Sequence, residues 1–475
     1  MNAVSDKPFI THENIRSLAF FTSVAALGGF LFGFDTAVIS GTINALRDKF
    51  QLDSMMEGSL VSSALVGCIV GALLAGPLSD TFGRKKILIL SAVLFLISAI
   101  GSSVPNTVST LMTARVVGGL GVGMASMLSP LYISEYSPAA LRGRMVSLYQ
   151  LAIVIGILIA YFSNALIVMN AEKYASGSMD HGFWSYLFLE ETWRGMFFVE
   201  AIPAALFLVL MFFIPESPRW LANQGQKEKA VSLLSKVIGT QEAQKEIDDL
   251  GQLLSIEKSS VTELLKPSMR LPLLIGILLP FFSQVTGINV IIYYGTSIFK
   301  EAGLGIHSSF GAQVLVGFIN MLFTVIAIWK VDRFGRKPLL LTGSLALSLI
   351  LLLLGILFSR GGTTSFVVPL LFCLHVAFFA MSFGPVTWIV IAEIFPSKIR
   401  GRAMAVATFT IWISCALVSQ TFPWLRDHLG TVKTFFIYAF FLSPSIWIIW
   451  YKIPETKQKT LEEIEQHWLA DGSRL

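Results

Sequence analysis

Charged residues are scarce in this sequence. Only 14% of its 475 residues are Asp, Glu, Lys or Arg, whereas 54% are hydrophobic and the mean hydropathy is +0.70. Soluble domains average about 25% charged residues, and a soluble chain of this length would form about three domains. The charged residues are too few to cover the surfaces of three such domains. These numbers exclude an ordinary cytosolic enzyme, a disordered scaffold and a disulfide-stapled secreted domain, and they indicate a chain solvated by lipid.

Cysteine is also scarce, and no pattern typical of a catalytic or metal site is present. The three cysteines, Cys68, Cys373 and Cys415, all lie in apolar runs, so we expect small packing residues and no disulfides. The Ser, His and Asp residues have no triad spacing, and no cluster has the spacing of metal ligands. We therefore expect a protein that is not an enzyme and has no cofactor or metal.

The positive charge is concentrated in short clusters between apolar runs. The net charge is +5, and the clusters lie at 84–86, 142–144, 333–337 and 398–402. Loops on the cytoplasmic side of a membrane carry such clusters, whereas nucleic-acid binding would call for a basic face on a soluble domain. We predict no nucleic-acid partner. The polar residues up to Arg16 lack the form of a cleaved signal, so none is expected.

Twelve apolar runs are long enough to cross a bilayer as helices, which takes about 20 residues each. The sequence therefore predicts an all-α membrane protein with 12 transmembrane helices and both termini in the cytoplasm. The longest predicted external loop is 170–194. The twelve runs are 18–40, 59–79, 87–104, 108–132, 144–168, 196–214, 273–299, 310–330, 338–358, 366–392, 403–424 and 433–452.

The two halves of the chain repeat three patterns in the same order. Asp80 to Lys85 (Asp-Thr-Phe-Gly-Arg-Lys) returns as 332–337, and Glu with Arg-Gly-Arg at 135–144 returns at 393–402. A Pro-Glu pair follows the last apolar run of each half, at 215–216 and at 454–455. We predict six-helix halves at 1–214 and 271–453, a helical cytoplasmic linker at 215–270 and a tail at 454–475. Such duplicated architectures place the substrate at the bilayer midplane between halves that rock.

Longer motifs resemble the sugar porter family of the major facilitator superfamily. They include Pro-Glu-Ser-Pro-Arg-Trp at 215–220, Gln-Val-Thr-Gly-Ile-Asn at 284–289 and Pro-Glu-Thr-Lys at 454–457. The stretches 28–41 and 114–130 look most like bacterial xylose–proton symporters. The resemblance implies a proton-coupled symporter of a pentose or hexose that works by alternating access. It also implies a bacterial inner membrane location, with a sugar, H⁺ and the lipid bilayer as partners and a monomer as the functional unit.

Asp35 and Arg115 are the charged pair expected to couple protons to transport. A charge at the centre of a span costs about 2.5–3.5 kcal/mol, so it should be paired or neutral. Counting about 1.5 Å per residue from the outer ends of their spans places the two at similar depth. The resemblance implies that this acid is the proton carrier, and it adds Glu200 as a second coupling acid. The alternative is a static ion pair that only fixes helix packing.

Polar and aromatic residues inside the spans are the sugar-site candidates. Amides both donate and accept hydrogen bonds, as sugar hydroxyls require, and aromatic rings suit the apolar sugar faces. Each amide has the alternative role of an interhelical hydrogen bond. The resemblance implies a site made of Phe32, Gln150, Ser283, Gln284, Asn289, Tyr293, Asn320, Gly384, Trp388 and Trp412.

Three positions depart from the family pattern. Ser283 stands where relatives commonly have a glutamine, Ile411 where the xylose symporters have another, and Cys415 where an asparagine is common. The site should therefore be less polar than a familiar glucose or xylose site, and the identity of the sugar stays open.

The repeated charged clusters are candidates for a cytoplasmic gate, with positive-inside topology as the alternative. A facilitative uniporter and a non-transporting sugar receptor also remain possible functions. The predicted gate residues are Asp80, Arg84, Glu135, Arg142, Arg144, Glu216, Arg219, Asp332, Arg336, Glu393, Arg400, Arg402 and Glu455.

Overall fold

The fold was obtained as a computed structural model and consists of helices. The structure describes residues 12–138, 141–174, 182–253, 266, 269–360, 366–395 and 399–457, and no strand occurs among them. Eleven helical segments are long and apolar enough to cross a membrane. The last of them, α18 (Arg400–Lys452), bends at Gly430, where φ is 82° and ψ 155°, and so crosses twice. Twelve crossings result, as the sequence predicts.

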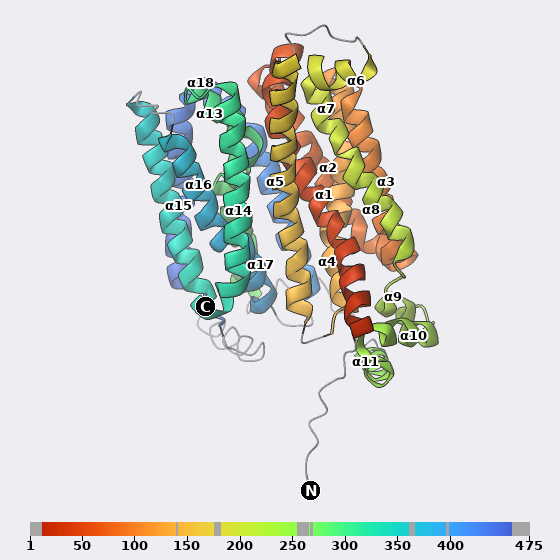
Figure 1. The fold of residues 1–475 in the computed structure, drawn as a ribbon. Coiled ribbons are helices and arrows are strands. Elements are labelled where there is room, and N and C mark those ends of the chain that lie inside the picture. Colours follow the sequence, from red (N-terminus) through yellow and green to blue (C-terminus); the bar gives the residue numbers. More distant parts are fainter. Residues whose placement is uncertain are drawn as a thin grey trace.

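The first six crossings form one bundle in Figure 1. Glu200 separates the two helices of the sixth crossing, α7 and α8. The elements of this bundle are α1 (His12–Phe50), α2 (Ser54–Phe82), α3 (Arg84–Ser103), α4 (Val108–Tyr136), α5 (Arg142–Tyr174), α6 (Phe183–Ser185), the π-helix η1 (Tyr186–Glu190), α7 (Thr192–Val199) and α8 (Ala201–Phe213).

The second bundle has two crossings that are interrupted near their middle. Gly287, with a left-handed φ of 81°, separates α12 from α13, and Ser382 separates α16 from α17. Interrupted helices at membrane depth are typical of transporter substrate sites. The elements before α18 are α12 (Arg270–Val285), α13 (Ile288–Glu301), α14 (Ile306–Phe334), α15 (Arg336–Ser359), α16 (Val367–Met381) and α17 (Phe383–Ile394).

Three short helices pack against one end of the first bundle, beside the start of α1 (Figure 1). They are α9 (Pro218–Asn223), α10 (Lys227–Ile238) and α11 (Thr240–Leu253), and they lie in the stretch 215–270 for which a helical linker is predicted. The rest of the predicted linker, apart from 266, 269 and 270, and the predicted tail after 457 lie outside the described residues. We name this end of the molecule the linker end and the opposite end the far end.

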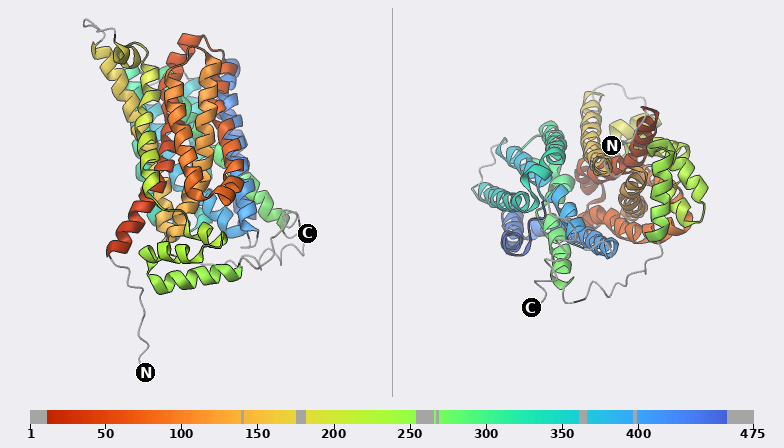
Figure 2. Two further views of the ribbon diagram at one scale, coloured as in Figure 1. Left: turned by 90° about the vertical axis from the view of Figure 1, so that its right-hand side faces the viewer. Right: turned by 90° about the horizontal axis from the view of Figure 1, so that it is seen from below.

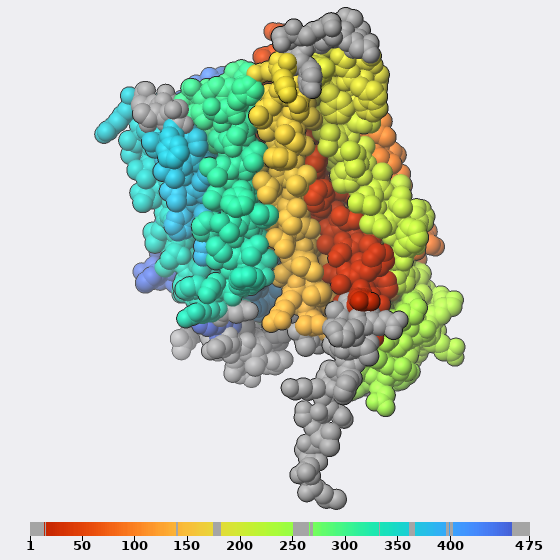
Figure 3. All heavy atoms as spheres, in the orientation of Figure 1, coloured from red at the N-terminus to blue at the C-terminus, as the bar shows by residue number. Residues whose placement is uncertain are grey.

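The two bundles lie side by side, as the view from the linker end in Figure 2 shows. In Figure 3, α5 and α14 meet along a long seam. The seam is close because Gly317 has no side chain where the Tyr161 ring packs. Between α2 and α18, Gly58 lies so near the Gln420 carbonyl that an added Cβ would be 2.3 Å from its oxygen. The first and second halves are therefore in direct contact.

Most of the described residues in the segment predicted as an external loop at 170–194 are helical. α5 continues to Tyr174, and helical turns cover Phe183 to Glu190. Arg194 fixes the end of this segment to the first bundle. Its buried guanidinium donates to the Ser103 carbonyl at 3.1 Å and to Asn106 at 2.8 Å, and it lies over the Trp193 ring.

Candidate functional site

Asp35 on α1 and Arg115 on α4 form a buried ion pair. Arg115 Nη1 donates to Asp35 Oδ1 at 2.6 Å, and Nη2 donates to the Asp35 backbone oxygen at 3.2 Å. Each side chain is only 3% exposed. The contact expected from equal helix depth is thus present. Arg115 also lies over the Phe197 ring at 5.6 Å, so three crossings surround the pair.

Glu200 is a second buried acid near this pair. It stands at the junction of α7 and α8 and is 1% exposed. Its Oε1 has no hydrogen-bond partner among the described residues. An ionised carboxylate without a partner is costly in an apolar interior, so this group is suited to carrying a proton. The structure therefore brings Asp35, Arg115 and Glu200 into one region of the first bundle.

The interrupted seventh crossing carries three of the predicted sugar ligands. The break at Gly287 separates Gln284 on α12 from Asn289 and Tyr293 on α13, and it turns their side chains together. Asn289 Nδ2 donates to Gln284 Oε1 at 2.5 Å and to the Cys415 Sγ at 3.1 Å. The Tyr293 hydroxyl lies 3.6 Å from the same sulfur. Cys415, at the position where relatives commonly have an asparagine, therefore contacts two of these predicted sugar-binding side chains directly.

Two aromatic rings connect the predicted sugar site to the proton site. The rings of Phe32 on α1 and Trp412 on α18 lie 5.5 Å apart between centroids. They belong to different halves, and Phe32 is three residues before Asp35 on the same helix. The Phe32 ring, which contacts Trp412, is thus less than one helical turn from Asp35 along α1.

The remaining predicted sugar residues occupy other helices of the two bundles. Ser283 is buried next to Gln284, and Asn320 is buried on α14. Gln150 on α5 is half-buried, as are Gly384 and Trp388 on α17 directly after the break at Ser382. Among the described residues, no side-chain hydrogen bond joins them to Gln284, Asn289 or Tyr293.

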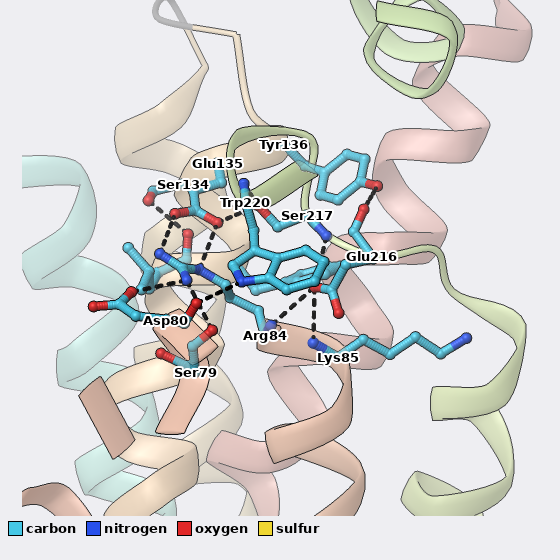
Figure 4. Close-up of polar contacts among 12 residues, drawn as sticks. Ser79, Asp80, Arg84, Lys85, Ser134, Glu135, Tyr136, Glu216, Ser217 and Trp220 are labelled. Carbon is cyan, nitrogen blue, oxygen red and sulfur yellow. Dashed lines mark hydrogen bonds and ion pairs between the residues drawn. The ribbon is translucent and has the colours of Figure 1, made fainter. Parts of the chain in front are cut away.

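The charged cluster of the first half is built around Arg84 and two glutamates, as Figure 4 shows. Arg84 Nη1 donates to Asp80 at 2.9 Å, and its Nε lies 3.4 Å from Glu135 Oε2. Glu216 Oε1 accepts the backbone N–H groups of Arg84 at 2.9 Å and of Lys85 at 3.0 Å. These contacts fasten the start of the linker to α2, α3 and α4.

The second half repeats this arrangement with different residues. Arg336 Nη2 donates to Glu393 at 3.0 Å. Glu455 accepts the backbone N–H groups of Arg336 at 3.0 Å and Lys337 at 3.1 Å. In each half a glycine with positive φ, Gly83 or Gly335, leaves room for the carboxylate. The sequence repeat is therefore also a repeat of geometry.

The other predicted gate residues make fewer contacts. Arg142 donates to the Ser134 carbonyl at 3.1 Å and lies 3.5 Å from Glu246 on α11. Arg144 and Arg219 are exposed. The Nη1 of Arg402 is buried without a hydrogen-bond partner among the described residues. The side chains of Asp332 and Arg400 lie outside the described residues.

Two hydroxyl residues in these clusters were missed by the sequence reasoning. Ser217 Oγ donates to Glu135, and Thr456 Oγ1 donates to Glu393 at 2.5 Å. Each follows the Glu of a Pro-Glu pair, so their shared position in the two halves was the available signal.

Polar contacts between the halves close the far end. The Tyr161 hydroxyl donates to the Ile292 carbonyl at 3.0 Å, and Thr296 donates to the Ser40 carbonyl. Ser62 donates to Gln420 at 2.6 Å. All three link a crossing of the first half to one of the second, on the far side of the Asp35 level.

A family model described as "Sugar (and other) transporter" matches residues 21–468. The chain belongs to this sugar transporter family. It is a multi-pass membrane protein and not an enzyme. It is 40% identical over 463 residues to the arabinose-proton symporter of Bacillus subtilis, with 97% of each chain covered. It is 43% identical over 473 residues to a glucose transport protein of Synechocystis sp., covering 97% of this chain and 99% of the relative.

Solved structures of a xylose transporter from Escherichia coli have the same fold. The inward open conformation of that transporter matches with a TM-score of 0.81 at 38% identity, over 95% of this chain and 100% of that one. A structure of the proton:xylose symporter bound to 6-bromo-6-deoxy-D-glucose matches with a TM-score of 0.77 at 39% identity, over 96% and 100% of the two chains. The twelve-helix major facilitator fold is thereby established.

Proposed function

We propose that this protein is a proton-coupled symporter of a monosaccharide, a pentose or a hexose, which works by alternating access. The observation that carries the proposal is the buried pair of Asp35 and Arg115 at 2.6 Å, one turn along α1 from the aromatic contact of Phe32 with Trp412. Relatives that match along nearly the whole chain are proton symporters of arabinose and of D-xylose.

Asp35 is the proton carrier in this proposal, and Glu200 is an auxiliary site. When Asp35 is ionised, Arg115 compensates its charge. When Asp35 takes up a proton, the ion pair weakens and Arg115 is free to contact another acceptor. Glu200 lies close by with an unpaired oxygen. A change of partner by Arg115 would link protonation to the arrangement of α1, α4 and α7.

The sugar would bind between the halves, at the break in the seventh crossing. Gln284, Asn289 and Tyr293 offer amide and hydroxyl groups from the second half, with Ser283, Asn320, Gly384, Trp388 and Trp412 as further contacts. Phe32 and Gln150 contribute from the first half. Cys415 would replace an amide contact with a weakly polar sulfur, which suits a ligand that presents fewer hydroxyls or a more apolar face there.

The linker end is the cytoplasmic side in this proposal, because the basic clusters lie there. A chain with twelve crossings then has both termini in the cytoplasm, in the bacterial inner membrane. The contacts between the halves at the far end would make that end the closed side in the present state. The charged clusters around Glu216 and Glu455 are each held within one half here, and they would bridge the halves when the cytoplasmic side closes. The halves 1–214 and 271–453 would move as units, with a monomer sufficient for transport.

The test is transport by purified protein in liposomes under an imposed proton gradient, with a panel of aldopentoses and aldohexoses. Without a gradient, sugar entry should make the external medium more alkaline. Asp35→Asn should abolish uphill accumulation, a loss of at least about tenfold, while sugar exchange continues. Sugar entry without any external pH change would instead establish a facilitative uniporter, and the proton-coupled proposal would be wrong.

A further inference from the structure

A second buried ion pair joins the two halves at the far end, away from the proton and sugar sites. Glu57 is at the start of α2, and Arg426 is on α18 just before its bend at Gly430. Arg426 donates through Nη1 to Glu57 Oε1 at 3.3 Å and through Nη2 to Oε2 at 3.1 Å. The two side chains are 6% and 1% exposed. This two-pronged contact crosses directly from one half to the other.

Each member of the pair also has a partner within its own half. Arg47, near the end of α1, donates to Glu57 Oε2 at 3.4 Å. Asp427, next in sequence to Arg426, accepts from its Nε at 2.8 Å. If the halves separated here, neither Glu57 nor Arg426 would be left without an opposite charge.

The helices that carry the pair are in tight contact. Gly58, directly after Glu57, packs on the Gln420 carbonyl. The Gln420 side chain accepts from Ser62 at 2.6 Å and donates to Ser59 at 3.1 Å. A movement of α2 away from α18 at this place would therefore break the Glu57–Arg426 contact.

Burial determines how strongly this contact holds the halves together. Attraction between charges is stronger in a poorly polarisable interior than in water, and both side chains of this pair are almost fully buried. The exposed cross-half pair of Glu172 on α5 and His307 on α14 lacks this property, since its side chains are 49% and 54% exposed and exposed pairs contribute little.

We propose that Glu57 and Arg426 form a far-end latch that stabilises the state closed at the far end. On opening, the cross-half contact is lost, and Glu57 keeps Arg47 while Arg426 keeps Asp427. These local partners make the latch reversible, because opening leaves no buried charge alone. The inference rests on the alternating access of the proposed function, but it requires neither proton coupling nor a particular sugar.

The test measures the far-end opening directly. Spin labels at Val104→Cys, at the end of α3, and Lys433→Cys, on α18 beyond the bend, mark the far ends of the two halves; both positions are exposed. The three native cysteines are buried. In lipid nanodiscs the unmodified latch should give mainly the short distance of the closed state. Glu57→Gln should raise the open-to-closed ratio at least about tenfold.

A double-mutant cycle distinguishes a latch from two unrelated structural residues. Because both substitutions remove the same contact, Glu57→Gln with Arg426→Gln should open the far end no more than the stronger single variant. Arg426→Lys keeps the charge but loses the fork of two donors, so it should give an intermediate shift and serves if Glu57→Gln does not fold. The matched control, Glu172→Gln, should leave the distances unchanged.

Unchanged distances in all three latch variants, or additive effects in the cycle, would overturn the latch. Proton-coupled transport by the same variants would show that the proposed function stands without it. Failure of the proton coupling, in turn, leaves the distance measurement valid, because a uniporter also alternates its access.

Discussion

At the scale of single residues, Cys415 distinguishes the proposed sugar site from the family pattern. Its sulfur accepts from Asn289 at 3.1 Å and lies 3.6 Å from the Tyr293 hydroxyl. It therefore orients two groups that the proposed function assigns to the sugar. Sulfur is a weak acceptor and a weak donor, so both groups keep most of their hydrogen-bonding capacity for a ligand.

Replacing this sulfur should change sugar affinity more than turnover. We expect Cys415→Ala to change the KM about three- to tenfold, since a lost hydrogen bond is worth about 0.5–1.5 kcal/mol, with kcat for exchange altered less than twofold. Sugar-uptake kinetics in liposomes provide the measurement. Cys373→Ala on α16, the matched removal of a buried thiol, should leave KM unchanged. Equal effects of the two variants on KM would show that Cys415 does not contribute to sugar binding.

At the scale of elements, the junction of α2 and α3 depends on a glycine. Gly83 has φ of 100°, and an added Cβ would be 2.3 Å from Glu216 Oε2. Glu216 accepts the N–H groups that the start of α3 cannot satisfy internally. The hydrogen bonds of Glu216 thus fix the start of the linker to the first turn of α3. The same construction recurs at Gly335 with Glu455.

Gly83→Ala should destabilise this junction. The left-handed backbone costs a non-glycine residue about 1–3 kcal/mol, and the added methyl group displaces the Glu216 carboxylate. We expect a lower Tm in detergent, measured by intrinsic tryptophan fluorescence. Gly76→Ala is the control, since nothing lies within 4 Å of its added Cβ and alanine is favoured within a helix. If both variants melted alike, the Glu216 contact would not be stabilising.

At the scale of the whole molecule, Glu455 makes stability depend on pH. Burial raises the pKa of this carboxyl, but the backbone N–H groups of Arg336, Lys457 and Lys337 and the charge of Arg336 outweigh burial and lower it below its ordinary value of 4.5. A lowered pKa means that folding stabilises the ionised form of the Glu455 carboxyl relative to the protonated form. The stabilisation is present above pH 4.5 and is lost as the pH falls through the lowered pKa.

Glu455→Gln should accordingly lower the Tm at pH 7 by roughly 1–2 °C, a small shift for a partly exposed group in a chain of this size. The difference from the unmodified protein should shrink below pH 4.5. Thermal unfolding across pH 3.5–7 provides the measurement, with Glu228→Gln on the exposed face of α10 as control. A Tm difference that stayed constant with pH would show that the carboxylate charge is not responsible.

Much of the fold and part of the site could be predicted from the sequence. Twelve apolar runs and three repeated motifs are sufficient for the two-half architecture, and equal helix depth predicts the contact of Asp35 with Arg115. The far-end pair was missed because Glu57 precedes the predicted second span, which starts at 59, and Arg426 follows the eleventh, which ends at 424. Helices continue beyond their apolar runs, and the opposite half buries these polar ends.

The interruption at Gly287 has a mechanical consequence for α13. The helix beyond it has 14 residues and ends at Glu301, so it is a stiff rod about 21 Å long, and Gly287 at its start is the point about which it would pivot. Asn289 lies about 3 Å along this lever arm and Lys300 about 20 Å along it. For any rotation about Gly287, the tip would therefore travel roughly six times as far as Asn289, and a tilt of about 10° would carry it about 3–4 Å. A shift of under 1 Å at a bound ligand is thus amplified into a displacement that can separate Thr296 from Ser40.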